Sequence, residues 1–302
     1  MMKTVLEQIR RILPEAAVLE QEPMKNHCSF CSGGPVSAFL IPEEEETLRK
    51  LLALLSESGA PYYILGNGTN VVFPDGGKAC FVVSTEKLQG LTSEKENHIS
   101  AQAGVTLSRL ASFAQEHALT GLEFASGIPG SVGGGILMNA GAYGGEMKDA
   151  VVAVRCCSRD GQKIREYSAA ECEFAYRHSL FQQEECVILS AEFCLESGDK
   201  NKIAERMKEL SIRRREKQPL NLPSAGSAFR RPAGYYAAAL IEQCGLKGVS
   251  IGGAQVSEKH AGFIVNTGGA TTAELEALLT LVSNTVKEKT GVELQREVIL
   301  IP

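Results

Sequence analysis

Two segments rich in glycine and small polar residues have the composition of loops that hold an anion through the backbone. Such loops expose consecutive N–H groups, and the missing side chains allow close approach to a ligand. The segments are Leu65, Gly66, Asn67, Gly68, Thr69 and Asn70, and Gly127, Ile128, Pro129, Gly130, Ser131, Val132, Gly133 and Gly134. Either alone is more simply a tight turn. Two of them, about 60 residues apart, favour a site for a large dinucleotide.

Neither segment matches a familiar phosphate-binding motif. Gly66-x-Gly68 follows an apolar stretch, as a dinucleotide turn would, but Val71 stands where the Rossmann fingerprint has its third glycine. No Gly-Lys-Ser or Gly-Lys-Thr sequence is present, which also excludes the Walker P-loop. The remaining way for these loops to bind a phosphate group is donation from backbone N–H groups, aided by the polar side chains of the first loop.

An arginine next to an aromatic residue, Tyr176-Arg177, offers a second kind of anion site. A guanidinium presents parallel donors that match a carboxylate or a phosphate. The simpler interpretation is a surface arginine paired with Glu171 or Glu173, and these residues alone favour it.

Two more residues have chemically suggestive surroundings. Ser227 follows Gly226 in a predicted turn over residues 224–227, without a nucleophile-elbow pattern, so its hydroxyl is a candidate proton donor rather than a nucleophile. Glu297 lies in a predicted closing strand over residues 292–301, where an acid among apolar residues is costly unless it is paired or functional.

The elements that must position these residues alternate between helices and strands. Residue periodicity and end signals predict both kinds of element. The predicted helices cover residues 42–59, 107–119, 199–217 and 235–244, and the predicted strands cover 62–65, 151–157, 186–195 and 292–301. A capping box from Thr271 to Glu274 starts a further helix. The composition changes near Gly198, which predicts a domain boundary there.

Length and charge limit the classes of protein. The 302 residues suffice for about two domains. The 31 basic and 36 acidic residues give a net charge of −5, which argues against a nucleic-acid partner. No run of about 18 apolar residues occurs, so no membrane insertion is expected. The first ten residues carry scattered charges and lack the apolar core of a signal peptide.

Cysteine and histidine usage predicts no metal site. Nine cysteines, an odd number, without a secretion signal indicate reduced thiols and a cytoplasmic location. Cys28 and Cys31 form a lone CxxC pair, whereas a zinc site needs further ligands and a redox site needs a thioredoxin-like context. The five histidines show no ligand spacing.

Taken in order, these residues resemble one family, the UDP-N-acetylenolpyruvoylglucosamine reductases, flavoenzymes that complete UDP-N-acetylmuramate for peptidoglycan. The matching blocks span the chain from about residue 25 to 300. They are Leu65–Asn70, Gly127–Gly134, Tyr176–Ser179, Ala225–Phe229 and Glu297. As a set they are specific, although each block alone is not.

The resemblance implies an α+β protein with a two-lobed FAD-binding domain of the vanillyl-alcohol-oxidase / p-cresol-methylhydroxylase type and a C-terminal α+β substrate-binding domain. The expected limits are 1–24 for an N-terminal helix and linker, 25–198 for the FAD-binding domain, with lobes at about 25–85 and 86–198, and 199–302 for the substrate-binding domain. The first glycine loop has Asn67 and no histidine, so FAD is expected to bind without a covalent bond.

The resemblance also implies the reaction and its residues. NADPH would reduce FAD, and the enolpyruvyl group of a small-molecule UDP-sugar would then be reduced. Arg177 and Glu297 would stabilise the enolate-like charge, and Ser227 would deliver the proton. Tyr176 and Lys217 would bind the substrate. A monomer is expected.

Two departures bear on this resemblance. Only 50 positions separate the arginine and serine blocks, which indicates the subtype without an inserted tyrosine loop. Arg230-Arg231-Pro232 stands where the family often has Lys-Asn-Pro, so no asparagine contact to the substrate is assigned. The alternative is another FAD-dependent oxidoreductase on the same scaffold, which would need both glycine loops but not the three catalytic residues together.

Overall fold

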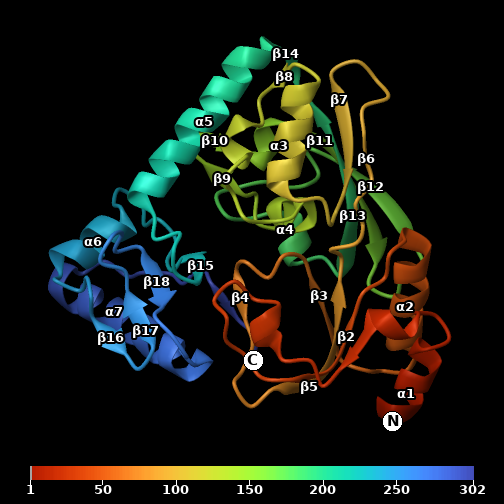
Figure 1. Ribbon diagram of the computed structural model, residues 1–302, viewed down its shortest axis with the longest axis horizontal. Coiled ribbons are helices and arrows are strands. Elements are labelled where there is room, and N and C mark those ends of the chain that lie inside the picture. Colours follow the sequence, from red (N-terminus) through yellow and green to blue (C-terminus); the bar gives the residue numbers. More distant parts are fainter. Residues whose placement is uncertain (1) are drawn as a thin grey trace. The chain divides into compact units, whose positions relative to one another are not determined.

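The computed structural model describes residues 2–302 and divides into two compact units (Figure 1). Unit 1 comprises the residues up to Glu20, Ser37–Asn67 and Ala79–Ile212. Unit 2 comprises Gln21–Val36, Gly68–Lys78 and Arg213–Pro302. Each unit is therefore assembled from three stretches of sequence. The predicted domain limits of 1–24, 25–198 and 199–302 stay a prediction.

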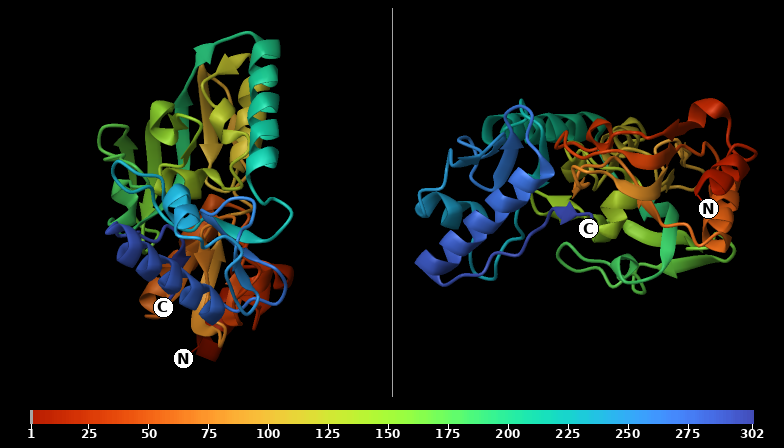
Figure 2. Two further views of the ribbon diagram at one scale, coloured as in Figure 1. Left: turned by 90° about the vertical axis from the view of Figure 1, so that its left-hand side faces the viewer. Right: turned by 90° about the horizontal axis from the view of Figure 1, so that it is seen from below.

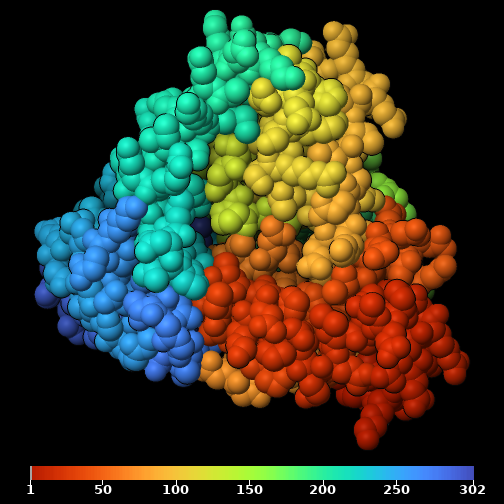
Figure 3. Space-filling model, in the orientation of Figure 1, coloured from red at the N-terminus to blue at the C-terminus, as the bar shows by residue number. Residues whose placement is uncertain are grey.

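The first sheet of unit 1 carries the first glycine loop at its edge. Its strand order is β1 (Val18–Glu20), β2 (Val36–Leu40), β5 (Lys78–Ser84) and β3 (Tyr62–Leu65). Strand β3, at the residues predicted, runs parallel to β5 with Leu65 opposite Ser84. The apolar residues of this sheet form one core with helices α1 (Met2–Ile9) and α2 (Glu45–Glu57). These helices contact each other and form part of the red and orange surface in Figure 3.

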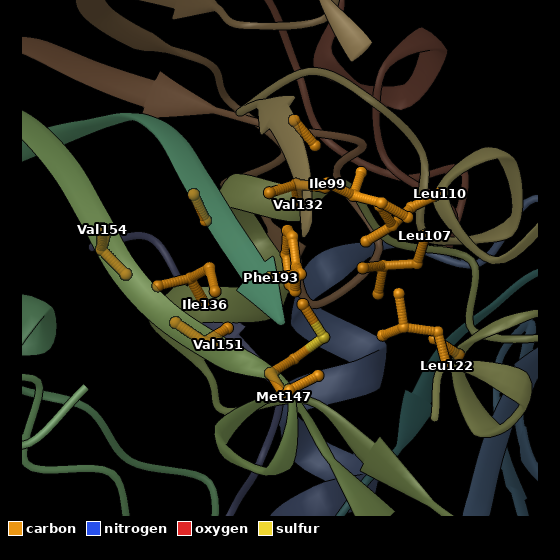
Figure 4. Close-up of a cluster of buried hydrophobic side chains, with 14 of the residues drawn as sticks. Ile99, Leu107, Leu110, Leu122, Val132, Ile136, Met147, Val151, Val154 and Phe193 are labelled. Atoms are coloured by element: carbon orange, nitrogen blue, oxygen red, sulfur yellow. The ribbon is translucent and has the colours of Figure 1, made fainter. Parts of the chain in front are cut away.

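The second sheet of unit 1 is fully antiparallel. Its order is β12 (Ile164–Ser168), β11 (Val151–Ser158), β13 (Cys186–Cys194), β7 (His98–Gln102) and β6 (Leu91–Thr92). Helices α3 (Leu107–Glu116) and α4 (Val132–Leu137) share its core. Figure 4 shows Phe193 amid Ile99, Val132, Ile136 and Met147. This core supports α4, which continues the second glycine loop.

Short elements complete unit 1. The two-residue strands are β8 (Leu119–Thr120), β9 (Gly141–Ala142), β10 (Gly145–Glu146) and β14 (Glu196–Ser197). Single-turn 3-10 helices lie at Glu15–Ala17, Glu123–Ala125, Met147–Asp149 and Leu180–Gln182, and a further one in unit 2 lies at Met24–Asn26. Helix α5 (Lys200–Lys217) begins in unit 1 and ends in unit 2.

Unit 2 is a four-stranded antiparallel sheet with two helices. The order is β15 (Ser224–Ser227), β18 (Phe263–Asn266), β17 (Ala254–Val256) and β16 (Ser250–Ile251). Helices α6 (Ala237–Gln243) and α7 (Thr272–Thr290) pack together, and α7 also contacts β16 and β17 (Figure 2). A separate parallel pair joins β4 (Val71–Val72) to β19 (Ile299–Leu300). This pair brings the end of the first glycine loop to residues near Glu297.

Four predicted elements differ clearly from the observed ones. The predicted helix over 42–59 begins only at Glu45, and the one over 235–244 only at Ala237. Residues 224–227 form edge strand β15 instead of a free turn, because Ser224 and Ser227 pair with β18; Gly226, with φ +76°, lies at the irregularity between these two pairs. The predicted closing strand over 292–301 shortens to β19, because the residues before it bond to two different segments rather than to one partner strand.

The capping box at the start of α7 is confirmed, and its contribution can be measured. The Thr271 hydroxyl accepts from the Glu274 N–H at 3.1 Å, and the Glu274 carboxylate accepts from the Thr271 N–H at 3.0 Å. We expect Thr271→Ala to lower the free energy of unfolding by about 1 kcal/mol, because it leaves a helix N–H without its acceptor. Urea denaturation followed by circular dichroism measures this change. Thr285→Ala, in the interior of α7, is the control, and an equal loss there would contradict the capping interpretation.

Candidate functional site

The structure brings the two glycine loops of unit 1 into contact. Leu65 ends β3, and its carbonyl accepts from the Thr85 N–H at 2.9 Å, which fixes where the first loop starts. A Cβ placed on the next residue, Gly66, would overlap the hydroxyl oxygen of Ser131. Glycine is therefore required at position 66 because the second loop lies directly against it, and no positive φ is involved.

The second loop is held by the segment before α3. The Leu107 N–H donates to the Gly130 carbonyl at 2.9 Å, and the Val132 N–H donates to the Val105 carbonyl at 2.8 Å. Gly133 lies so close to Ala103 that an added Cβ would be 3.0 Å from the alanine Cβ. The predicted loop ends earlier than expected, since Ser131 is the N-cap of α4 and the following glycines form the first turns of that helix.

Open backbone donors line the meeting point of these loops in unit 1. Among residues 2–302, no protein group accepts a hydrogen bond from the N–H of Gly66, Asn67, Gly127, Gly130 or Ser131. Clustered N–H groups of this kind suit an anion such as a pyrophosphate. The residues present therefore fit a dinucleotide such as FAD, with Asn67 placed for non-covalent contact where a covalent linkage would need a nucleophile such as histidine.

The rest of the first loop belongs to unit 2. Gly68 has φ +61°, and a Cβ there would overlap the carbonyl of His27. The Ser29 N–H donates to the Gly68 carbonyl at 3.0 Å, and the Ser29 hydroxyl donates to the Ser224 carbonyl at 2.7 Å. The segment around Ser29 thus joins the loop to β15, the strand that carries Ser227.

Ser227 and Glu297 come together in unit 2. Ser227 ends β15, paired with Phe263 of β18. The next residue, Ala228, accepts from the Glu297 N–H at 2.9 Å. Glu297 is half-buried and lies on irregular backbone just before β19. The backbone of the acid is therefore bonded to the segment that carries the hydroxyl.

The loop of unit 1 that carries Arg177 has an unusual backbone. Arg177 has φ +54°, a conformation that costs energy for a side chain larger than glycine and is often found at functional sites. Its guanidinium donates to the Gly141 carbonyl at 3.1 Å and lies 5.1 Å from the centre of the Tyr176 ring. Glu171, the simpler partner considered above, accepts hydrogen bonds from Ser168, which lower its pKa, and from Arg165.

Sequence reasoning missed Asn139, a completely buried residue at the end of α4. Its carboxamide N–H groups donate to the Ala175 carbonyl at 2.9 Å and to the Glu146 carboxylate at 3.0 Å, and its oxygen accepts from the Lys148 N–H at 3.0 Å. The Ser179 hydroxyl donates to the Leu137 carbonyl at 2.8 Å. These bonds attach the Arg177 loop to the helix that starts at the second glycine loop. The available signal was an asparagine just after a helix, a residue that tolerates positive φ.

Lys217 ends α5 with an exposed side chain. Burial lowers the pKa of the neighbouring His260, and the positive charges of Lys247 and Lys217 lower it further. Lys247 is paired with Glu242 at 3.0 Å, so the charges near His260 include both signs.

The CxxC pair has two very different thiols. Cys28 is buried, which raises its pKa to about 12, whereas Cys31 is exposed. We therefore expect iodoacetamide at pH 8 to label Cys31 and to spare Cys28 in the folded protein, because the thiolate is the reactive form. Peptide mass spectrometry before and after unfolding measures this, and equal labelling of both in the native state would contradict it. Across residues 2–302 no three His, Cys, Asp or Glu side chains are grouped as metal ligands.

None of the helices in the described chain is both long and apolar enough to span a bilayer.

Comparison with known proteins gives the family. Residues 218–301 match the model described as the C-terminal domain of UDP-N-acetylenolpyruvoylglucosamine reductase, and residues 36–166 match an FAD binding domain. The UDP-N-acetylenolpyruvoylglucosamine reductase of Caldanaerobacter subterraneus subsp. tengcongensis is 46% identical over 100% of this chain and 99% of its own length.

Solved structures agree with these matches. The crystal structure of the UDP-N-acetylenolpyruvylglucosamine reductase from Thermus caldophilus is similar with a TM-score of 0.80 and 32% identity, covering 94% of this chain and 99% of that one. Phl p 4.0202, a glucose dehydrogenase, has a TM-score of 0.50 at 12% identity over 65% of this chain and 44% of its own, which is a likeness of fold alone.

These findings confirm the predicted α+β fold class, with an FAD-binding domain and a C-terminal domain of the reductase type, and they confirm FAD as the cofactor. The matches extend over nearly the whole length of both chains, so they apply to the protein and not to one domain of it. The chain belongs to the UDP-N-acetylenolpyruvoylglucosamine reductase family.

Proposed function

We propose that the protein reduces UDP-N-acetylglucosamine enolpyruvate to UDP-N-acetylmuramate, with NADPH as the reductant and FAD as the bound cofactor. The observation that carries this proposal is the 46% identity to a reductase of that name over the whole chain. The contact of Gly66 with Ser131 adds to it, because it forms the double loop that such a cofactor needs.

Bound FAD supplies the hydride chemistry, and the residues of this chain bind, orient and protonate the substrate. Backbone N–H groups of the two glycine loops would hold the pyrophosphate of the cofactor. In addition to the loop residues already named, Lys217 would bind a substrate phosphate and Tyr176 would line the substrate site. These assignments rest on residue chemistry and on the family resemblance.

Three residues would act on the enolpyruvyl group. Reduction at its methylene carbon places negative charge on the neighbouring carbon and its carboxylate. Arg177 would stabilise this charge with charge-assisted hydrogen bonds, and Glu297, in its protonated form, would add a hydrogen-bond donor. The hydroxyl of Ser227 would then deliver a proton to the neighbouring carbon. Support for this assignment is that Glu297 is bonded to Ala228, the residue after Ser227.

An absorption spectrum of the purified protein tests the proposal. A yellow protein is expected, with a flavin band that bleaches on anaerobic addition of NADPH and recovers when UDP-N-acetylglucosamine enolpyruvate is added. Mass spectrometry should find UDP-N-acetylmuramate in the same amount as the NADPH consumed. Bleaching without recovery by this substrate, together with oxygen uptake driven by sugars, would favour the alternative of another FAD-dependent oxidoreductase.

We further propose that the protein is a cytoplasmic monomer. All nine cysteines are free thiols in the structure, which supports a reducing compartment. Light scattering after size-exclusion chromatography measures the mass, and a value near twice 32.4 kDa would exclude the monomer.

A further inference from the structure

Glu297 depends on a few specific hydrogen bonds for its position. The residues from Val292 to Val298 form no regular strand, and only Arg296 makes a single bridge, to Phe229. A residue inside a helix or a sheet is held by the bonds of the whole element. Glu297 lacks this support, so the groups that bond to its own N–H and carbonyl fix the position of its backbone.

Two groups in unit 2 bond to the backbone of Glu297. The Glu297 N–H donates to the Ala228 carbonyl at 2.9 Å. The Glu297 carbonyl accepts from the Asn70 carboxamide at 3.1 Å. The first bond ties the acid to the segment after Ser227, and the second ties it to the last residue of the first glycine loop.

Asn70 also bonds to the segment around Glu297 through its own backbone. Its carbonyl accepts from the Ile299 N–H at 2.9 Å, directly before the parallel pairing of β4 with β19. The side chain and the main chain of Asn70 thus contact residues two apart, 297 and 299. This double attachment fixes the register of the segment as well as its distance from the loop.

The side-chain bond requires an N–H donor of this length. Alanine would leave the Glu297 carbonyl without its partner, and aspartate has the shape of asparagine but would place an oxygen against the carbonyl oxygen. Asn70 is partly shielded from solvent, so water would replace the bond imperfectly. The geometry at this position therefore favours a hydrogen-bond donor with the shape of asparagine.

We propose that Asn70 is a positioning residue for Glu297, which couples the cofactor loop to the acid assigned to stabilising the enolate-like charge. Asn70 thereby has a role in catalysis through Glu297 in addition to any contact with the cofactor. This inference rests on the proposed function, since it concerns the second half-reaction of that enzyme.

The test compares the two half-reactions in Asn70→Ala and Asn70→Asp, each saturated with FAD and followed by anaerobic stopped-flow absorbance. We expect flavin reduction by NADPH to stay within about twofold of the unmodified protein. We expect reoxidation by UDP-N-acetylglucosamine enolpyruvate to slow about 10- to 100-fold, the range that a small misplacement of a reacting group produces. Asn70→Asp preserves the volume of the side chain, so it remains informative if the alanine variant is unstable.

A double-mutant cycle separates positioning from a general structural effect. In a Glu297→Gln background, Asn70→Ala should slow reoxidation by no more than about twofold, because coupled residues are non-additive. Full additivity of the two losses would overturn the proposal, and so would equal slowing of both half-reactions.

Asn201→Asp, an exposed substitution in the first turn of α5, introduces the same charge and should leave both half-reactions unchanged. The activity of the unmodified protein distinguishes a failure of the proposed function from a failure of the role proposed for Asn70. If it fails to turn over the enolpyruvyl substrate, the proposed function is wrong, whereas turnover with additive losses overturns only the role of Asn70.

Discussion

Replacing Ser227 with alanine is expected to stop formation of UDP-N-acetylmuramate while leaving the flavin reducible by NADPH. The hydroxyl is assigned to the final proton transfer, and loss of a well-placed general acid costs about 100- to 10,000-fold in rate. Flavin reduction does not need this proton, so the bleaching step should keep its rate. Stopped-flow absorbance at the flavin band measures each step separately.

The solvent isotope effect adds a second measurement for Ser227. If its hydroxyl delivers the proton, reoxidation of the unmodified protein should slow in deuterium oxide, whereas flavin reduction should not. Ser250→Ala, on exposed strand β16 of the same unit, is the matched control and should behave as the unmodified protein does. Normal product formation by Ser227→Ala would refute the assigned role.

Gly66→Ala is expected to weaken FAD binding about 10- to 100-fold. The new methyl group would overlap the Ser131 hydroxyl, and overpacking a tight contact costs about 1–3 kcal/mol. Ser131 is buried and caps α4, so it cannot move away freely, and the shift would spread to the backbone donors proposed to hold the cofactor. Titration of the apoprotein with FAD, followed by quenching of flavin fluorescence, measures the dissociation constant.

A partner substitution makes this prediction specific. Ser131→Ala removes the clashing oxygen and leaves the Ser131 Cβ at 3.6 Å from the new methyl carbon, an ordinary contact. Gly66→Ala combined with Ser131→Ala should therefore bind FAD more tightly than Gly66→Ala alone. Gly76→Ala, where a Cβ meets open space, is the control for loss of a glycine. A double variant no better than Gly66→Ala would show that the two loops do not meet in this way.

Elements with local signals were predictable from the sequence. Strand β3 lies at the predicted residues 62–65, and the capping box at Thr271 marks the start of α7 within one residue. The strand predicted over 186–195 is β13, because its alternating apolar residues fill one face. These predictions succeeded because the information lies in neighbouring residues, whose periodicity and end signals act locally.

Elements that depend on distant partners were not predictable. Residues 224–227 have the composition of a turn and become a strand only because β18 pairs with them. The carboxamides of Asn70 and Asn139 find acceptors 227 and 36 positions away, at the carbonyls of Glu297 and Ala175. No spacing rule predicts such a bond. The identities of the site residues could therefore be expected from the sequence, but the bonds that position them could not.

The composite core of unit 2 has a consequence for how variants of this gene can recombine. Phe30 and Val72 are fully buried among residues of the C-terminal segment, although neither belongs to that segment. The Asn266 carboxamide donates to the Phe30 carbonyl at 2.9 Å, and the Thr272 hydroxyl donates to the Phe73 carbonyl at 2.6 Å. A crossover that exchanged only residues 218–301 between two relatives would combine one parent's helices with the other parent's buried aromatic ring. Viable hybrids are therefore expected to inherit the stretches around positions 30 and 72 together with the C-terminal segment.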